Sequence, residues 1–515
     1  EQQHSQREGS CCGVRASCIM TSPSIASSWP PGTILESTSR RNSLLGEDED
    51  GEASSSSPSN FRERKHRYGN RAAQPQLAVG DMLHEENSKL VLVLVGLPAR
   101  GKTYIGRKIS NYLNWLGIVC RVFNVGMYRR NLFGAQQAAS FFSSEDEQGS
   151  RARWHAAEQA MEDMIQYLEG GGQVAIYDAT NSTRQRRNWI RERCREHFLE
   201  PLFIESICND PALIEKNILN TKMHSPDYAG MSPEEAVEDF KKRIDFYEKS
   251  YETIVDPTVS YIKLIDVGTQ TILNRISGFL AGKLVFFLMN LNIHPPVIWL
   301  TRHGESEYNS EGKIGGDPNL TPQGRRYARK MGEWIDQRKQ ELFGVEGEKI
   351  PPTSVWTSSL RRTVETAECA GFYDKTSEYC VSNWKVLDEI DAGDFEGLTY
   401  AYMEENMPEE WKARQDDKLR YRYPRGESYE DVVVRLEPVI IELERRDEKA
   451  LLIVAHQAVL RAIYGYLTEK HIAEVPRLDM PLHTVIELYP RAYGVEEKRF
   501  LLEPLEHEFL SDGED

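Results

Sequence analysis

Around residue 100, eight residues have the types and spacing needed to hold a nucleoside triphosphate. The stretch Gly96–Thr103 matches the pattern G-x-x-x-x-G-K-[ST] and directly follows the apolar run Leu90–Val95, which predicts a buried strand. The glycines let the backbone curl until successive N–H groups face a polyphosphate. Lys102 can then reach the β- and γ-phosphates, and Thr103 can ligate Mg²⁺. This order predicts a site for ATP with Mg²⁺.

A carboxylate further along the chain can complete that site. Gln173–Tyr177 predicts another strand, and Asp178 follows it. P-loop proteins place the aspartate that organises Mg²⁺ at such a strand end, although a helix cap is the alternative for Asp178 taken alone. Several cations in the same region have the chemistry to bind a phosphorylated acceptor if they converge. They are Arg129, Arg130, Arg153, Arg184, Arg186, Arg187, Lys222, Lys241, Lys242 and Arg243.

A second set of reactive side chains lies in the C-terminal half. Val297–Thr301 predicts a strand that runs into Arg302-His303-Gly304, and Ala450–Ala455 predicts a strand that ends in His456-Gln457. Arg362 and Glu389 lie between them in the sequence. Since ligands of open α/β sheets bind beyond the carboxyl ends of strands, these side chains can share one crevice.

That set suits phosphoryl transfer. A neutral imidazole can attack phosphorus, arginines can neutralise the transferring group, and a carboxylic acid can protonate the leaving alkoxide. For each histidine taken separately, a structural role is the alternative. Together with the Arg-His-Gly-Glu sequence, the set favours catalysis.

The elements that position these residues predict two α/β domains with mostly parallel sheets. Apolar strands alternate with helical patterns over residues 90–266, including a strand over Ile118–Phe123 and a helix from about Arg151. The apolar spacing predicts a long amphipathic helix over Thr271–Leu291, before a boundary at His294-Pro295-Pro296. We therefore expect a disordered tail (1–87), an α/β domain that carries the P-loop (88–293), an α/β domain that carries the two histidines (294–490) and an acidic C-terminal tail (491–515).

Composition limits the partners and the compartment. The net charge of −17 gives no support to a nucleic-acid surface. The eight cysteines form no C-x-x-C pair and fit a reducing cytosol. The longest apolar stretch, Leu284–Ile293, is too short for a membrane span, and the first residues lack a secretory signal pattern.

The tandem arrangement closely resembles the bifunctional 6-phosphofructo-2-kinase/fructose-2,6-bisphosphatase family. The resemblance covers about residues 88 to 490. It rests on the segments Gly96–Thr103, Phe123–Arg130, Tyr177–Arg187, Ser225–Tyr228, Leu300–Ser306, Trp356–Glu368, Glu389–Gly393, Tyr421–Asp431 and Ala455–Arg461. It implies a P-loop kinase followed by a histidine phosphatase of the phosphoglycerate-mutase-like fold. The kinase would phosphorylate O2 of fructose 6-phosphate with ATP and Mg²⁺, and the phosphatase would remove that phosphate without a cofactor.

The resemblance also implies roles for individual residues of the kinase. Asp178 and Lys222 would be catalytic, and Thr103 and Asp178 would hold the metal. ATP would lie against Gly96, Gly101, Lys102, Thr103 and Tyr104. Fructose 6-phosphate would lie among Arg129, Arg153, Thr180, Arg186, Arg243 and Tyr247. The family's usual Arg-Pro-Asp-Asn is replaced in this chain by Ser143-Ser144-Glu145-Asp146.

In the phosphatase, the resemblance implies that His303 carries the phosphoryl group, that Glu389 acts as acid and that His456 is the third catalytic residue. The bisphosphate would be bound by Arg302, Asn309, Gly315, Arg362, Tyr400, Arg414, Lys418, Arg422, Tyr429, Gln457 and Arg461. Three other functions are alternatives: an enzyme that retains only one of the two activities, a polynucleotide kinase–phosphatase and a non-catalytic regulatory protein. The polynucleotide enzyme is disfavoured because no basic track with interleaved aromatic residues is present.

Partners and regulation are further expectations. We expect a cytosolic homodimer that acts on fructose 6-phosphate, fructose 2,6-bisphosphate and ATP, and that binds neither nucleic acid nor membrane. Ser43 follows Arg40-Arg41, a pattern that basophilic kinases favour, which predicts a regulatory phosphosite for a protein kinase. An unremarkable polar tail is the alternative.

Overall fold

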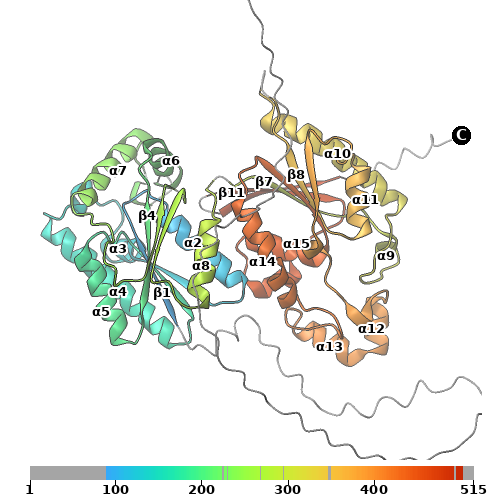
Figure 1. The fold of residues 1–515 in the computed structure, drawn as a ribbon, viewed down its shortest axis with the longest axis horizontal. Coiled ribbons are helices and arrows are strands. Elements are labelled where there is room, and N and C mark those ends of the chain that lie inside the picture. The colour runs from blue at the N-terminus through green and yellow to red at the C-terminus, as the bar shows by residue number, and fades with distance from the viewer. Residues whose placement is uncertain are drawn as a thin grey trace, which may run out of the picture. The chain divides into compact units, whose positions relative to one another are not determined.

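The computed structural model describes residues 89–222, 226–228, 230–266, 268–293, 295–345, 349–491 and 494–502. Ser43 and the rest of the expected N-terminal tail lie outside these ranges. Within them the chain forms two sheets of six strands each, with orders β2-β3-β1-β4-β5-β6 and β12-β11-β7-β10-β8-β9 (Figure 1). Both sheets are mostly parallel, which confirms the expected α/β class.

The first sheet carries the P-loop. Its strands are β1 (Leu90–Val95), β2 (Cys120–Asn124), β3 (Val174–Asp178), β4 (Pro201–Ile207), β5 (Tyr261–Ile265) and β6 (Gln270–Asn274). Its helices are α2 (Lys102–Trp115), α3 (Val125–Phe133), α4 (Glu147–Glu169), α5 (Arg184–Glu196), α6 (Pro211–Lys222), α7 (Pro233–Glu248) and α8 (Phe279–Met289). The first five strands pair in parallel, and β6 runs antiparallel to β5.

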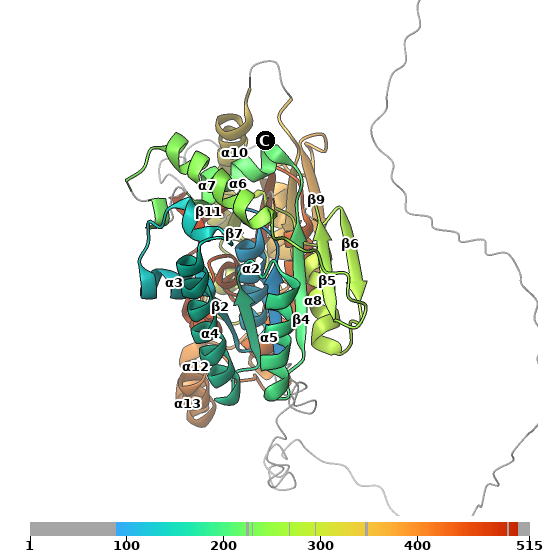
Figure 2. The same ribbon diagram turned by 90° about the vertical axis from the view of Figure 1, so that its left-hand side faces the viewer.

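Helices cover both faces of this sheet because side chains alternate along its buried strands. Leu92 and Leu94 pack with α2 and α8 in one apolar cluster. Val91, Val93 and Val95 pack with α4 and α5 in another. Figure 2 looks onto one face of the sheet, with α4 and α5 in front of it. The strand predicted over Leu90–Val95 is confirmed.

The second sheet carries the histidines. Its strands are β7 (Val297–Arg302), β8 (Thr353–Thr357), β9 (Tyr379–Asn383), β10 (Ala450–Ala455), β11 (Thr484–Arg491) and β12 (Gly494–Leu501). Its helices are α9 (Glu307–Ser310), α10 (Pro322–Phe343), α11 (Arg361–Cys369), α12 (Tyr400–Asn406), α13 (Pro408–Asp416), α14 (Tyr429–Arg445) and α15 (Gln457–Leu467). The central strand β10 is fully buried and pairs in parallel with β7 and β8.

Contacts link helices of the two domains. Trp115 of α2 donates its indole N–H to the Ala462 carbonyl of α15 at 2.9 Å, and its ring meets Tyr466 edge-on. Lys108 of α2 forms a 2.7 Å ion pair with the buried Glu444 of α14. The apolar cluster that includes α2 and α8 continues into α14 and α15.

Two expectations about the elements are wrong. The helix predicted over Thr271–Leu291 is a strand, β6, followed by the shorter helix α8. Left-handed backbone at Arg275 (φ 51°) and Gly278 (φ 89°) separates the two, while the apolar residues happened to fall at helical spacing. The acidic tail predicted over 491–515 begins instead with β12, which pairs with β11 over its whole length. Charged residues cover the exposed surface of β12, so its composition resembled a tail.

Two candidate active sites

The P-loop joins the end of β1 to the start of α2. Gly96 has φ 139°, and a Cβ atom there would lie 2.4 Å from the Ser206 carbonyl oxygen, so only glycine fits. Gly101 has φ 80° and directly precedes α2, whose N-terminus can face an anion. The Lys102 ammonium group donates to the Leu97 carbonyl across the loop at 2.6 Å. The loop therefore has the geometry to surround a polyphosphate.

Asp178 lies beside the P-loop because β1, β3 and β2 are parallel neighbours. Thr103 donates its hydroxyl to Asp178 Oδ2 at 3.0 Å, and Asn124 at the end of β2 donates its side-chain amide to the same oxygen at 2.5 Å. Asn124 has no assigned role from sequence, although its place at a strand end was a signal. Among the described residues no cluster of three or more His, Cys, Asp or Glu side chains could hold a metal. One hydroxyl and one carboxylate still fit Mg²⁺ that is completed by nucleotide phosphates and water.

The expected sugar-phosphate residues share a cavity with the P-loop. The cavity measures about 1730 Å³ and is lined by Lys102, Thr103, Tyr104, Asp178, Arg129, Arg153, Thr180, Arg186, Arg243 and Tyr247, among others. The Tyr104 hydroxyl donates to the Asn292 carbonyl at 3.3 Å. Lys222 is the last residue of α6, and its side chain lies outside the description.

Asp227 gathers three of these cations, a role that sequence reasoning missed. The buried Arg129 donates to both Asp227 oxygens at 2.8 Å, while Arg130 and Arg243 lie 3.5 and 3.6 Å from that carboxylate. Burial alone would raise the pKa of Asp227, but the Arg129 hydrogen bond and the arginine charges outweigh it and lower the pKa. One carboxylate among three arginines leaves an excess of positive charge that suits a phosphate.

Aromatic rings and backbone carbonyls fix the other cations. The Arg186 guanidinium lies over Trp154 at 4.1 Å and over Trp189 at 4.6 Å. Arg153 donates to the Phe141 and Ser143 carbonyls. Within the segment that departs from the family pattern, Asp146 caps α4 by accepting from the Gly149 N–H at 2.8 Å.

The two histidines meet at the carboxyl ends of β7 and β10. The backbone N–H of His303 donates to the Ala455 carbonyl at 3.1 Å. The centres of the His303 and His456 imidazole rings lie 5.1 Å apart. Arg362 Nε lies 3.1 Å from His303 Nε2 and 3.2 Å from His456 Nδ1. The predicted convergence of both histidines with Arg362 is therefore present.

Hydrogen bonds select the tautomer of each ring. A carbonyl can only accept, so His303 Nδ1–H donates to the Gly304 carbonyl at 2.6 Å and Nε2 keeps its lone pair. Since Arg362 can only donate to His456 Nδ1, His456 Nε2–H faces the Ser358 hydroxyl at 2.7 Å. Ser358 follows β8, and its role was missed. Burial lowers the pKa of both histidines well below the ordinary value, and Arg362 lowers each further. Both rings are neutral at pH 7.

Glu389 lies at the N-terminus of α15, beside His456. Its Oε2 accepts from the Gln457 N–H at 3.0 Å, and its Oε1 accepts from the Ala458 and Ile390 N–H groups at 3.1 and 3.0 Å. The helix that starts at Gln457 thus positions the carboxyl group next to the histidine pair.

Arginines and a lysine extend this site. Arg414 donates to the Tyr423 and Tyr400 hydroxyls, and Arg461 donates to the Tyr429 hydroxyl. Burial lowers the pKa of Lys418 to about 8, with further lowering by Arg461, Arg414 and Arg477. Together these cations have the charge and the hydrogen-bond donors to hold an anion.

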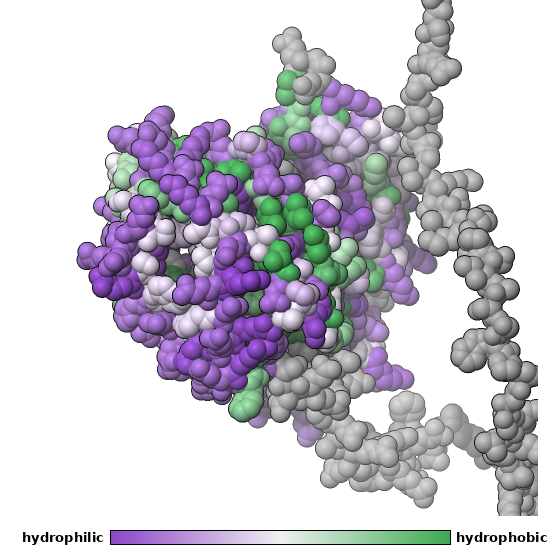
Figure 3. Space-filling model, turned by 60° about the vertical axis from the view of Figure 1, so that its left-hand side comes forward, coloured by the Kyte–Doolittle hydropathy of each residue, from purple (hydrophilic) through white to green (hydrophobic). Residues whose placement is uncertain are grey.

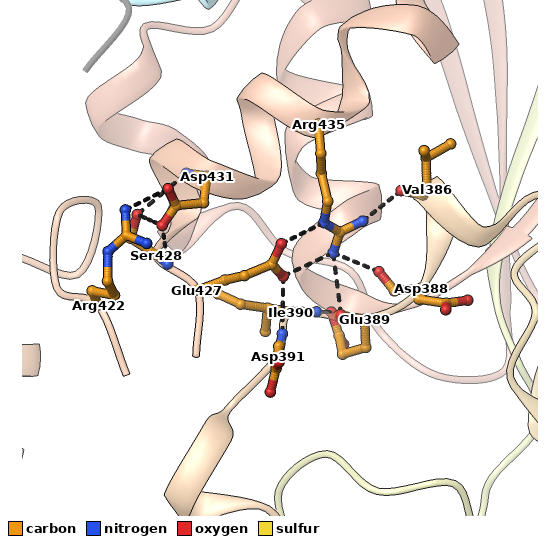
Figure 4. Close-up of polar contacts among 10 residues, drawn as sticks. All are labelled: Val386, Asp388, Glu389, Ile390, Asp391, Arg422, Glu427, Ser428, Asp431 and Arg435. Atoms are coloured by element: carbon orange, nitrogen blue, oxygen red, sulfur yellow. Dashed lines mark hydrogen bonds and ion pairs between the residues drawn. The ribbon is translucent and has the colours of Figure 1, made fainter. Parts of the chain in front are cut away.

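The remaining expected residues lie around the histidines or at the rim. Asn309 accepts from the Ser306 N–H at 3.0 Å at the start of α9, and Gly315 has φ 63° in the loop where the Gly316 carbonyl accepts from Arg362. The buried Arg302 Nε has no hydrogen-bond partner among the described residues, as expected of a group that awaits an anion. Arg422 donates to Asp431 at 2.5 Å (Figure 4).

The first site combines a P-loop with a strand-end aspartate, and the second combines two neutral histidines with arginines and a carboxylate. These features define a phosphoryl-transfer protein with a kinase domain and a histidine-phosphatase domain.

Comparison with known proteins agrees with this class. Residues 80–295 match the 6-phosphofructo-2-kinase family, and residues 298–501 match branch 1 of the histidine phosphatase superfamily. A 6-phosphofructo-2-kinase/fructose-2,6-bisphosphatase of Gallus gallus is 46% identical over 421 residues, which are 81% of this chain and 85% of that protein. One of Arabidopsis thaliana is 46% identical over 82% of this chain and 56% of its own length. The chain belongs to the 6-phosphofructo-2-kinase/fructose-2,6-bisphosphatase family.

Proposed function

We propose that the chain makes fructose 2,6-bisphosphate from fructose 6-phosphate and ATP at the first site and hydrolyses its 2-phosphate at the second. The observation that carries the proposal is the histidine pair with Arg362, because it lies in the same chain as a complete P-loop. The names of the relatives support the two substrates. The alternative of a single retained activity has no observation in its favour.

In the kinase reaction, the P-loop N–H groups and Lys102 hold the β- and γ-phosphates. Mg²⁺ at Thr103 and Asp178 would supply charge neutralisation on those phosphates. Asp178 orients the attacking O2 hydroxyl, and Lys222 stabilises the charge that develops. Arg129, Arg153, Thr180, Arg186, Arg243 and Tyr247 hold the sugar phosphate in line with the γ-phosphate.

In the phosphatase reaction, the His303 Nε2 lone pair attacks the 2-phosphate. A phosphorus–nitrogen bond forms while the bond from phosphorus to O2 breaks, and Glu389 donates a proton to the leaving O2. Arg302, Asn309, Arg362 and His456 stabilise the charge on the transferring group. Water then attacks the phosphorus of the phosphohistidine while the Glu389 carboxylate takes a proton from the water. The phosphorus–nitrogen bond breaks, which restores His303 and Glu389 and releases phosphate.

A labelling experiment tests the phosphatase mechanism. Substrate labelled at the 2-phosphate should leave acid-labile, base-stable label on His303 under rapid quench. Glu389→Gln should slow the labelling roughly 10²–10⁴-fold, since O2 loses its proton donor. Label on another residue, or no label in an active enzyme, would contradict the mechanism. Assay of the same protein with ATP and fructose 6-phosphate tests the kinase.

The expected homodimer also belongs to the proposal. The edge strand β6 exposes Ile272 and Leu273, and α8 exposes Phe279, Phe286 and Met289. Figure 3 shows apolar residues gathered on the face that it draws. An edge strand beside apolar side chains can pair with a second copy of the chain. Sedimentation of the wild type should give a dimer, and Phe286→Glu should shift it towards the monomer. A monomeric wild-type protein would contradict the proposed homodimer.

Compartment and regulation complete the proposal. The cysteines in the described ranges, at 120, 194, 208, 369 and 380, are all free, which supports a reducing cytosol. No helix in those ranges is long and apolar enough to cross a membrane.

Phosphorylation of Ser43 would add charge that can favour the phosphatase over the kinase. The test compares both activities of wild type and Ser43→Ala after treatment with a cyclic-nucleotide-dependent kinase. An unchanged ratio would contradict a regulatory role.

A further inference from the structure

Arg435 of α14 donates hydrogen bonds to the backbone of the loop that carries Glu389. Figure 4 shows Arg435 with its guanidinium group between Glu427 on one side and the backbone of Val386, Asp388 and Glu389 on the other. We propose that Arg435 is a positioning residue of the phosphatase site, and that it sets where the Glu389 carboxyl group lies. This inference rests on the proposed role of Glu389 as proton donor.

The Arg435 guanidinium group donates hydrogen bonds to acceptors of the protein itself. Its Nη2 donates to the Asp388 carbonyl at 2.7 Å and to the Glu389 carbonyl at 3.1 Å, and its Nη1 donates to the Val386 carbonyl. Nε donates to Glu427 Oε1 at 2.7 Å, and Nη2 also donates to Glu427 Oε2 at 3.1 Å. Three carbonyls and one carboxylate therefore surround a planar fork whose geometry lysine cannot reproduce.

Glu427 extends the same network past Glu389. Its Oε2 accepts from the Asp391 N–H at 3.0 Å, and its own N–H donates to the Asp391 carbonyl at 2.8 Å. The backbone is thus tied on both sides of Glu389, at Asp388 by Arg435 and at Asp391 by Glu427. The segment 388–392 belongs to no helix or strand and lies between two single turns, Lys385–Leu387 and Gly393–Phe395.

Glu389 is consequently fixed at both ends. Its carboxyl group is held by the α15 N–H groups next to His456, and its backbone is held by Arg435. A proton donor must lie within hydrogen-bond reach of the leaving oxygen, and a misplacement of about 1 Å can lower a rate about 10²-fold. Loss of Arg435 should therefore weaken proton donation while the histidines, on β7 and β10, keep their places.

The test uses the full chain and two substrates that differ in their need for an acid. Fructose 2,6-bisphosphate has a leaving alkoxide that requires a proton, whereas the phenolate of p-nitrophenyl phosphate leaves without one. We expect Arg435→Gln to lower the rate of His303 labelling by fructose 2,6-bisphosphate about 10–100-fold and to leave labelling by p-nitrophenyl phosphate nearly unchanged. Arg435→Lys should fall almost as far, because one ammonium group cannot span four acceptors.

Three companion variants make the result decisive. Arg445→Gln is the matched control, since Arg445 lies on the same helix and pairs with Glu442 at an exposed position. Glu427→Gln is the second variant if Arg435→Gln does not fold, and circular dichroism with urea unfolding of each protein reports folding. Glu389→Gln is the benchmark for loss of the acid.

The outcomes separate the two ideas. Equal loss with both substrates in the Arg435 and Glu427 variants, while Glu389→Gln stays selective for the alkoxide, overturns the positioning role alone. Full activity of Arg435→Lys also overturns it. Equal loss with both substrates in Glu389→Gln removes the proton-donor role, and the positioning role with it.

Discussion

In the proposed mechanism, His303 already has the tautomer and protonation state needed for attack before substrate binds. Its Nδ1–H is held by the Gly304 carbonyl, and burial beside Arg362 and Arg302 lowers its pKa, so Nε2 carries a lone pair at pH 7. The same arginines would repel a protonated ring, and they attract the phosphate that the ring must attack. One set of charges therefore serves both nucleophile and substrate.

The expected role of Lys418 in binding the bisphosphate predicts a pH limit for the phosphatase on the alkaline side. Its pKa of about 8 means that the ammonium group is charged below pH 8 and neutral above it. Since only the charged form attracts phosphate, kcat/KM for the bisphosphate should fall roughly tenfold or more as pH rises through 8. The measurement is a pH profile of kcat/KM. Lys418→Arg should remove the fall, because arginine stays protonated; an unchanged profile in that variant would rule out Lys418 as its source.

At the scale of elements, each site depends on strand ends that lie side by side. β1, β2 and β3 bring Thr103, Asn124 and Asp178 together, and β7, β8 and β10 bring together His303, Ser358 and His456. The helices that follow these strands then supply N–H groups, as α15 does for Glu389. Parallel pairing places all the carboxyl ends at one edge.

Gly304 tests how closely the nucleophile loop packs on α10. A Cβ atom there would lie 2.4 Å from the Gly324 carbonyl oxygen, which is backbone and cannot rotate away. Gly304→Ala should therefore lower phosphatase activity about 10²-fold and stability by about 1–3 kcal/mol, measured by assay and urea unfolding. Gly282→Ala is the control, because Gly282 lies on the exposed face of α8 and nothing lies within 4 Å of its Cβ position. It should gain roughly 0.5–1 kcal/mol. Full phosphatase activity in Gly304→Ala would refute the packing argument.

At the scale of the whole molecule, the two candidate sites lie on two different sheets, and helices that pack on these sheets contact each other. α2 begins at the P-loop and α15 begins beside His456, and these helices meet at Trp115 and Tyr466. The contact lies near the far end of each helix from its site. The reacting groups of the two sites are therefore separate.

The two activities should accordingly be lost independently. Lys102→Ala should lower kinase activity at least 10²-fold by removing a cation from the β- and γ-phosphates, and should leave phosphatase activity intact. His303→Ala should do the reverse. Both activities are measured on the same preparation, with circular dichroism as the control for folding. If either folded variant lost both activities, the two-site assignment would fail.

The local sequence pattern was enough to predict the features of this protein that are set by residues close together in the sequence. The apolar runs of β1 and β10 predicted both central strands, and the residues that follow them identified the P-loop and the His456 site. Such strands are buried on both faces, so successive residues along them are apolar and the sequence shows a continuous apolar run. The family resemblance then supplied most of the expected site residues.

Tertiary structure decided what depends on distant pairing. Arg129 meets Asp227 across 98 residues, and Arg435 meets the Glu389 loop across 46, so neither contact leaves a local signal. β6 and β12 were missed because an exposed edge strand has no continuous apolar face and is defined by hydrogen bonds to its neighbour. The histidine tautomers were likewise set by partners that only the fold brings within reach, because a ring nitrogen takes its proton state from the group it faces.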